Sequence, residues 1–268
     1  DEELERTSAD PLHDPYNGTP EDLFGRVKGK YCVTASNIAK FDGFHGLVVF
    51  NEKHPLRFTR EMLHDYIDTA GRWGDLAHAS DPEAKYYVFM WNCLWRAGAS
   101  LLHGHAQMIM GRGMHYAAVE ALRRAAAVYQ AHNRTNYFND LFLAHESVGA
   151  AFEKDGTKVI ANLTPKKENE VLLFAPFVSD SLKDRVYETL ECYRDRLGVN
   201  SFNVVIYTPP WADTPENWEG FPVVVRIVDR GDPSSRTADF GAMELYAASV
   251  VSSDPFALAR NLREVMGA

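Results

Sequence analysis

The sequence predicts an α+β fold in which helices cover a mainly antiparallel sheet. Three observations support this prediction. Short apolar strands alternate with amphipathic helical segments, the strands are spaced as in hairpins interrupted by helices, and one order of elements occurs twice along the 268 residues. The two copies are expected to pack together as an internal pseudo-dimer.

The first copy begins with an apolar strand at residues 44–50, and a turn at 53–55 leads into a helix over about 59–78. Residues 86–91 form the next strand, which leads into a motif strand after Asn92. The helix repeats apolar residues at spacings of three and four, which places them on one face. These residues are Met62, Leu63, Tyr66, Ile67, Ala70 and Trp73.

The second copy follows the same order. A strand at 170–174 precedes a helix that opens at Ser179, and further strands are expected at 202–207 and 221–229. The histidines of the first copy have no counterpart in the segment 223–228. We therefore interpret the repeat as a duplication in which only one copy keeps the chemistry.

Two further helices are expected to cover the sheet. The first is an Ala-rich stretch at about 116–132 between the copies, and the second starts at Asp254, an N-cap residue followed by Pro255. The predicted division of the chain is an N-terminal extension (1–30), the first copy with the motif (31–150) and a degenerate second copy (151–268).

The motif strand alternates two imidazoles and a carboxamide: His103, His105 and Gln107. Alternate residues of a strand point to one face, so these three side chains are expected to converge. Gly104 and Ala106, between them, leave the other face free for close packing. A lone His-x-His pair is more often structural, so its neighbours in the sequence decide the interpretation.

Those neighbours are suited to phosphate. Gly98, Ala99 and Ser100 offer backbone amides and a hydroxyl that could receive an anion, and Asn92 could hold a nucleotide phosphate. Each of these residue types is also ordinary in turns. Their spacing to His103 favours the functional interpretation.

The run from Asn92 to Gln107 resembles the signature of the histidine triad superfamily, in which an Asn and an Ala-Gly pair precede alternating histidines. Gln107 in the third position resembles the branch of galactose-1-phosphate uridylyltransferase and of dinucleoside polyphosphate and nucleoside-diphosphate-sugar phosphorylases. Looser similarity extends over roughly 31–266, including Gly241–Glu244 near the end. The resemblance implies a duplicated histidine-triad-like fold.

The resemblance also implies roles for individual residues. His105 would attack the α-phosphorus as a neutral imidazole and form a covalent nucleotidyl-histidine, and His103 would orient the loop or His105. Gln107 can hydrogen-bond a phosphate oxygen but cannot give up a proton near neutral pH. A glutamine there favours transfer over hydrolysis.

Three weaker candidates lie outside the motif. Asn37, in the segment 37–41, resembles the entry to the first strand in these transferases, and Lys40 and Lys166 could neutralise substrate charge. Lysines are usually solvated surface residues, so the structural interpretation stays open for both.

The predicted function is therefore a nucleotidyltransferase that moves a nucleoside monophosphate from a nucleotide sugar or dinucleoside polyphosphate to a sugar phosphate. A phosphorylase that uses inorganic phosphate is the alternative. A nucleotide hydrolase and a nucleotide-binding module without catalysis are further alternatives.

Charge and composition limit the other classes. A net charge of −9 argues against a general nucleic-acid binder, and no apolar run has the length of a membrane span. The polar segment 1–6 does not have the pattern expected of a signal peptide, and the three widely spaced cysteines favour a reducing cytoplasm. A homodimer remains open, because the uridylyltransferases dimerise.

The resemblance raises the question of metals as well. Uridylyltransferases often bind zinc through a Cys pair together with the first histidine of the motif, and no such pair occurs here. Other histidines and carboxylates could substitute, so no cofactor is assigned and zinc is left open. A second metal site is not expected, because the final strand carries Val223, Val225 and Arg226 where ligands would stand.

Overall fold

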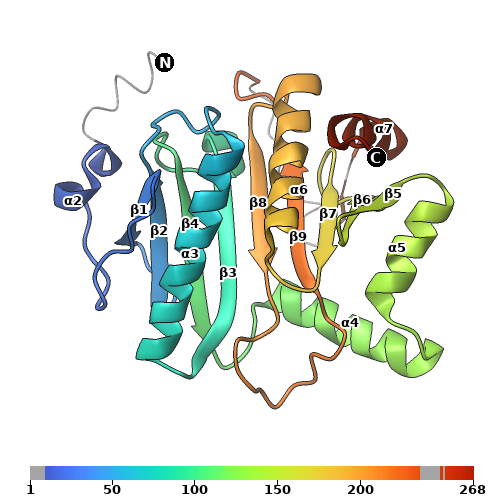
Figure 1. Ribbon diagram of the computed structural model, residues 1–268, viewed down its shortest axis with the longest axis horizontal. Coiled ribbons are helices and arrows are strands. Elements are labelled where there is room, and N and C mark those ends of the chain that lie inside the picture. Colours follow the sequence, from blue (N-terminus) through green and yellow to red (C-terminus); the bar gives the residue numbers. More distant parts are fainter. Residues whose placement is uncertain (1–9, 236–247, 250) are drawn as a thin grey trace.

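The computed structural model describes residues 10–235, 248–249 and 251–268. In these residues, nine strands form one continuous antiparallel sheet with helices on both faces (Figure 1). The α+β class and the mainly antiparallel sheet that the sequence predicts are confirmed. The predicted similarity of Gly241–Glu244 to uridylyltransferases falls outside the described residues.

The first half of the chain supplies four strands: β1 (Cys32–Ser36), β2 (Phe44–Phe50), β3 (Ala84–Cys93) and β4 (His105–Arg112). The second half supplies β5 (Ala151–Lys154), β6 (Thr157–Ala161), β7 (Val171–Ala175), β8 (Phe202–Tyr207) and β9 (Val223–Asp229). Their order across the sheet is β1-β2-β4-β3-β8-β9-β7-β6-β5.

The two halves share an order of four strands, and the second half has β5 as an additional strand at its edge. The order β1-β2-β4-β3 in the first half corresponds to β6-β7-β9-β8 in the second, and β3 pairs with β8 where the halves meet. One long helix follows β2 and another follows β7, at corresponding places. We propose that the halves descend from a duplication, and the boundary at residue 150 stays a prediction.

The long helices begin where polar side chains cap their first turns. Thr59, Ser179 and Asp254 each accept a hydrogen bond from a backbone N–H of the turn that follows. The helices are α3 (Arg60–Ser80), α4 (Ala117–Asn133), α5 (Tyr137–Ser147), α6 (Asp180–Glu191) and α7 (Pro255–Met266). No helix in the described residues is both long enough and apolar enough to cross a lipid bilayer.

Short helical turns complete the elements. They are η1 (Pro11–His13) and α2 (Pro15–Gly18) near the start, η2 (Trp95–Ala97) after β3, and the π-helical η3 (Cys192–Arg196) after α6.

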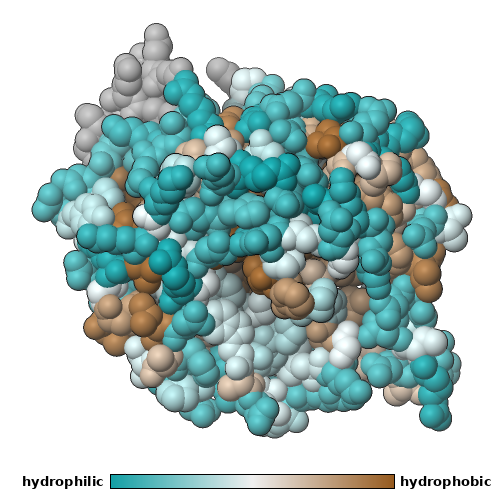
Figure 2. Space-filling model, in the orientation of Figure 1, coloured by the Kyte–Doolittle hydropathy of each residue, from teal (hydrophilic) through white to brown (hydrophobic). Residues whose placement is uncertain are grey.

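The main core lies between the sheet and the layer of α3, α6 and α7. Trp73 of α3 and Trp91 of β3 are fully buried there, and Phe50 stacks on Tyr66 with ring centroids 3.8 Å apart. The outer side of this helical layer is mostly hydrophilic, with some hydrophobic side chains around a central hollow (Figure 2). α3 and α6 therefore form an ordinary amphipathic cover on one face of the sheet.

The opposite face of the sheet is covered only in part. α4 and α5 pack over strands of the second half, and the N-terminal segment packs over β1 and β2 through Leu12, Leu47 and Val49. The strip between these covers carries the motif residues of β4. The helices of segment 116–150 thus lie on the second half of the sheet, although the predicted division places them in the first copy.

Apart from the short helical turns, the elements that were not predicted from the sequence are β1, β5, β6 and α5. β5 and β6 form a hairpin whose turn residues, Asp155 and Gly156, both have positive φ. Asp-Gly is a strong hairpin signal, so this hairpin was recognisable from the sequence. β1 is only five residues long and is buried throughout, although residues 33–36 alternate between apolar and polar.

Gly46 of β2 offers a test of this packing. A Cβ at this position would lie 2.7–2.8 Å from the indole of Trp73. We expect Gly46→Ala to lower the free energy of unfolding by about 1–3 kcal/mol, because the core would be overpacked. Urea denaturation followed by circular dichroism measures the change.

The matched control is Gly71→Ala in α3, where a Cβ meets nothing within 4 Å. It should raise stability by about 0.5–1 kcal/mol, because alanine is the better helix former. Equal stability of Gly46→Ala and the wild type would contradict the packing described here.

Candidate active site

The candidate site lies on the open face of β4, opposite the layer of α3 and α6. β4 begins at His105, and Ala106 and Met108 point into the main core. By strand alternation, His105 and Gln107 therefore point to the other face. Gln107 pairs with Leu47 of β2 and Met90 of β3, so it lies between two neighbouring strands.

His105 is held in one orientation by the backbone. Its Nδ1 lies 2.8 Å from the carbonyl oxygen of His103, and its side chain is buried. A carbonyl oxygen can only accept, so Nδ1 carries the proton and Nε2 keeps its lone pair. Among the described residues, none forms a hydrogen bond with Nε2.

Burial also keeps His105 uncharged. Removal of its imidazole from water lowers its pKa below the usual value of about 6.5, and this effect outweighs the hydrogen bond to His103, which acts in the other direction. A neutral imidazole with a free nitrogen lone pair is the form that can attack phosphorus.

His103 differs from the expected arrangement. It precedes the first residue of β4, so the strand alternation covers only His105 and Gln107. Its Nε2–H donates to the carbonyl oxygen of Phe50 at 2.8 Å, and its ring lies edge-on to His13 with centroids 5.2 Å apart. His103 therefore holds His105 through its backbone carbonyl, while its own side chain fastens the loop to β2.

Gln107 contacts a third histidine, His45 of β2. His45 Nε2 lies 2.7 Å from Gln107 Oε1 and 2.9 Å from Asn37 Nδ2. The orientation of the Asn37 amide is set by Ala39, whose N–H donates to Asn37 Oδ1 at 2.9 Å. One nitrogen cannot accept from Asn37 and donate to Gln107 at the same time, so the tautomer of His45 decides which amide it engages.

His45 was not predicted as a site residue. It lies in the first predicted strand, and the separation of 62 residues between it and Gln107 gave no local signal. Burial lowers the pKa of His45, so its ring is neutral near pH 7. When its Nε2–H donates to Gln107 Oε1, the amide NH₂ of Gln107 is left to face the open side.

The predicted phosphate loop follows β3. Gly98 has a φ of 93°, a left-handed conformation that glycine adopts without strain, and Ser100 is exposed. Asn92 Oδ1 accepts a hydrogen bond of 2.7 Å from Asn203 Nδ2. The same Asn203 nitrogen donates to the carbonyl oxygen of Ala97 at 2.8 Å, so a residue of β8 holds the base of the loop.

A second support of the loop also comes from the second half. Arg96, beside the loop, donates from Nε to the carbonyl oxygen of Arg230 at 3.1 Å, and Arg230 Nη1 donates to Asn203 Oδ1 at 2.7 Å. The half without the histidines therefore positions the loop of the half that has them.

The two candidate lysines lie apart from each other. Lys40 Nζ is 3.8 Å from Asp22 Oδ1, a buried carboxylate that also accepts from Trp73 Nε1 at 2.7 Å. Lys166 lies in the second half and lines a cavity together with Arg226. The structure thus brings Asn37, His45 and Gln107 together and leaves Lys166 at a different place on the same face.

The described residues do not fit the zinc site that the uridylyltransferase resemblance suggests. Cys32, Cys93 and Cys192 are buried free thiols. Within the described ranges, no group of three or more His, Cys, Asp or Glu side chains is placed to hold a metal ion.

The buried histidines predict a pH-dependent stability. His45, His103, His105 and His115 all have pKa values lowered mainly by burial. Below about pH 6.5 the unfolded chain therefore binds more protons than the folded protein. The contribution of these histidines to the free energy of unfolding should be complete above that pH, and the free energy of unfolding should fall as the pH drops below it. Urea denaturation at pH 7.5 and 5.5 measures the difference.

His115→Gln should reduce this pH dependence, and His132→Gln, at an exposed helical position, should leave it unchanged. Carboxylates affect stability in a lower pH range. Glu120, for example, has a pKa of about 2, because Arg123 and Arg124 stabilise its charged form. An unchanged pH dependence in His115→Gln would contradict the assignment to buried histidines.

Solved structures share this fold. A galt-like protein from Arabidopsis thaliana aligns with a TM-score of 0.73 at 16% identity, over 96% of this chain and 92% of its own. An ADP-glucose phosphorylase from Arabidopsis thaliana with bound ADP-glucose aligns with a TM-score of 0.72 at 15% identity, over 95% and 88%. A uridylyltransferase aligns with a TM-score of 0.71 at 14% identity, over 93% and 88%.

No family model matches the sequence, and no curated protein matches it. The similarity is therefore one of structure. This chain has the fold of the uridylyltransferases and of ADP-glucose phosphorylase.

Proposed function

We propose that the protein is a nucleotidyltransferase that works through a covalent nucleotidyl-His105. It takes a nucleoside monophosphate from a nucleotide sugar or dinucleoside polyphosphate and passes it to a phosphorylated acceptor. The observation that carries this proposal is the state of His105, whose Nδ1–H is bonded to the His103 carbonyl while its Nε2 has no partner among the described residues.

In the first step, the Nε2 lone pair attacks the α-phosphorus of the donor. A P–N bond forms, and the P–O bond to the leaving sugar phosphate or nucleotide breaks. The bonding electrons leave with the phosphate oxygen. In the second step, a phosphate oxygen of the acceptor attacks the same phosphorus, the P–N bond breaks and neutral His105 is restored.

Gln107 suits this chemistry. A phosphate leaving group has a second pKa near 6 and departs as an anion, so it needs no proton from the protein. With its Oε1 turned toward His45, the Gln107 amide can donate its N–H groups to a phosphate oxygen of the donor. Asn92, Ser100 and the amides of Gly98 and Ala99 are proposed to bind the remaining oxygens.

Inorganic phosphate is the alternative acceptor. The structural similarity to an ADP-glucose phosphorylase favours including it, since that structure holds ADP-glucose. The two acceptors differ only in the second step, because the covalent intermediate is the same for both.

The first test is to detect the intermediate. The protein is incubated separately with UDP-glucose, ADP-glucose and a diadenosine polyphosphate, and the intact chain is weighed by mass spectrometry. We expect the mass of one nucleoside monophosphate to be added, and His105→Ala should lose both this adduct and turnover. Sugar phosphates or inorganic phosphate are then added to find which acceptor removes the adduct.

Turnover by His105→Ala would disprove the proposal. Release of free nucleoside monophosphate without an acceptor would indicate a hydrolase. Tight nucleotide binding without an adduct would indicate a binding module.

The second test concerns His45, which we propose positions Gln107. His45→Phe removes the hydrogen bond, and we expect adduct formation to slow about fivefold, the equivalent of a hydrogen bond worth about 1 kcal/mol. His115→Gln is the control, since His115 bonds the carbonyl oxygen of Thr208 away from β4 and should leave the rate unchanged. An unchanged rate in a folded His45→Phe protein would contradict the positioning role.

A further inference from the structure

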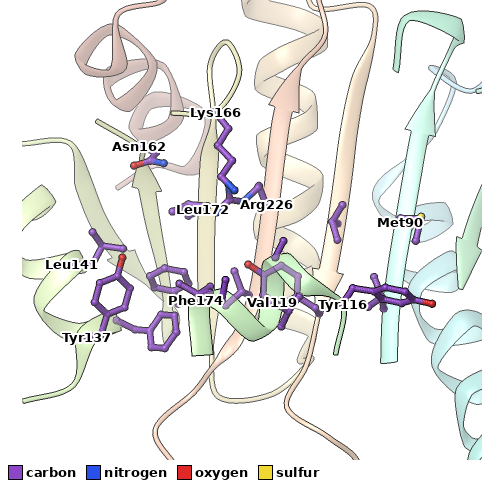
Figure 3. A pocket seen from close by; sticks show the side chains of 18 of the residues that line it. Met90, Tyr116, Val119, Tyr137, Leu141, Asn162, Lys166, Leu172, Phe174 and Arg226 are labelled. Atoms are coloured by element: carbon purple, nitrogen blue, oxygen red, sulfur yellow. The ribbon is translucent and has the colours of Figure 1, made fainter. Parts of the chain in front are cut away.

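A cavity lies on the same face of the sheet as His105, mostly over the second half. The cavity has a volume of about 630 Å³ and lies between β7, β8 and β9 on one side and α4 and the start of α5 on the other (Figure 3). It extends into the first half, where β3, β4 and Phe41 also line it. We call it the second-half cavity. Neither His105 nor Gln107 lines it.

The strand register places this cavity relative to the candidate active site. Gln107 of β4 pairs with Met90 of β3, Met90 pairs with Val205 of β8, and Val205 pairs with Arg226 of β9. The last three line the cavity. Arg226 is thus three strands away from Gln107, about 14 Å at the usual strand spacing.

A buried carboxylate, Glu170, lies behind the lining residue Arg226, and its side chain is 0% exposed. Its Oε1 forms an ion pair of 2.8 Å with Arg226 Nη1. Its Oε2 accepts from Asn162 Nδ2 at 2.7 Å and from the backbone N–H of Lys166 at 2.9 Å. Glu170 therefore has its Oε2 engaged by hydrogen bonds and its Oε1 by the ion pair, which places the guanidinium of Arg226 beside it.

A second cation stands beside Arg226. Lys166 comes from the loop before β7, and its side chain extends toward Arg226 at the rim of the cavity (Figure 3). Partial burial lowers the pKa of Lys166, and the positive charge of Arg226 lowers it further. Among the described residues, no carboxylate forms an ion pair with the Lys166 ammonium, so two cations face the cavity and one carboxylate balances them.

The rest of the cavity is apolar and rich in aromatic rings. Tyr137 and Phe138 from α5 and Phe174 and Tyr207 from the sheet line it, together with aliphatic side chains such as Val224. Flat apolar groups pack well against such rings. The lining therefore combines an apolar chamber with a cationic end.

We propose that the second-half cavity binds an anionic small molecule with an aromatic body, whose phosphate or carboxylate is held by Lys166 and Arg226. The distance of about 14 Å from the strand of Gln107 means that an anion held there does not react at His105. The anion-binding end is separate from the proposed transfer reaction, although the apolar end of the cavity reaches Phe41, which packs on His45. The proposal would stand if that reaction were disproved. The half that lacks histidines would then have a ligand of its own.

The probes are 1-naphthyl phosphate and 1-naphthoate, with 1-naphthol as the uncharged comparison, measured by isothermal titration on the full chain. We expect at least one anionic probe to bind more tightly than 1-naphthol. Lys166→Met approximately keeps the length of the side chain and should weaken binding about tenfold or more. This loss corresponds to the usual free-energy contribution of a hydrogen bond to a charged group. Lys167→Met, at the neighbouring position outside the cavity lining, is the matched control and should bind as the wild type does.

A second variant tests the apolar chamber without changing charge. Val205→Trp places a large ring on the cavity floor, on the face away from the main core, and should abolish binding of the probe. Failure of both anionic probes to bind the wild type would overturn the proposal. Wild-type affinity in folded Lys166→Met or in folded Val205→Trp would overturn it as well.

Discussion

The pairing of β3 with β8 is the interaction on which the rest of the structure depends. It joins the two halves into one sheet, so that Asn203 of β8 lies directly opposite Asn92 of β3. From this position a single carboxamide reaches both Asn92 and the carbonyl of Ala97. The loop next to His105 therefore rests on the second half, and the second half keeps a structural role even without histidines.

Burial determines the chemistry that the histidines can perform. His105 is fixed by a backbone carbonyl, and burial lowers its pKa more than that hydrogen bond and the charge of Asp10 raise it, so its ring is neutral. This matters in a chain with a net charge of −9, because attraction for an anion has to be local. The candidate site supplies neutral donors such as Gln107, whereas the second-half cavity supplies the cations Lys166 and Arg226.

Much of the fold followed from short-range patterns. Helix starts at Thr59, Ser179 and Asp254 agree with their capping side chains, and the strand at 44–50 has the predicted limits. The Asp-Gly turn of the β5–β6 hairpin carried an equally local signal that was overlooked. β1 gave only a weak local signal, because it is five residues long and consists mostly of small side chains.

The sequence by itself determined which chemistry-bearing residues share β4, since alternation places His105 and Gln107 on one face wherever the strand lies. Only the tertiary structure decided their partners. The hydrogen bond of His45 to Gln107, the support of the loop by Asn203 and the placement of Lys166 beside Arg226 all join residues far apart in the chain. Capping and periodicity act within a few residues, whereas strand register and burial result from the packing of the whole sheet.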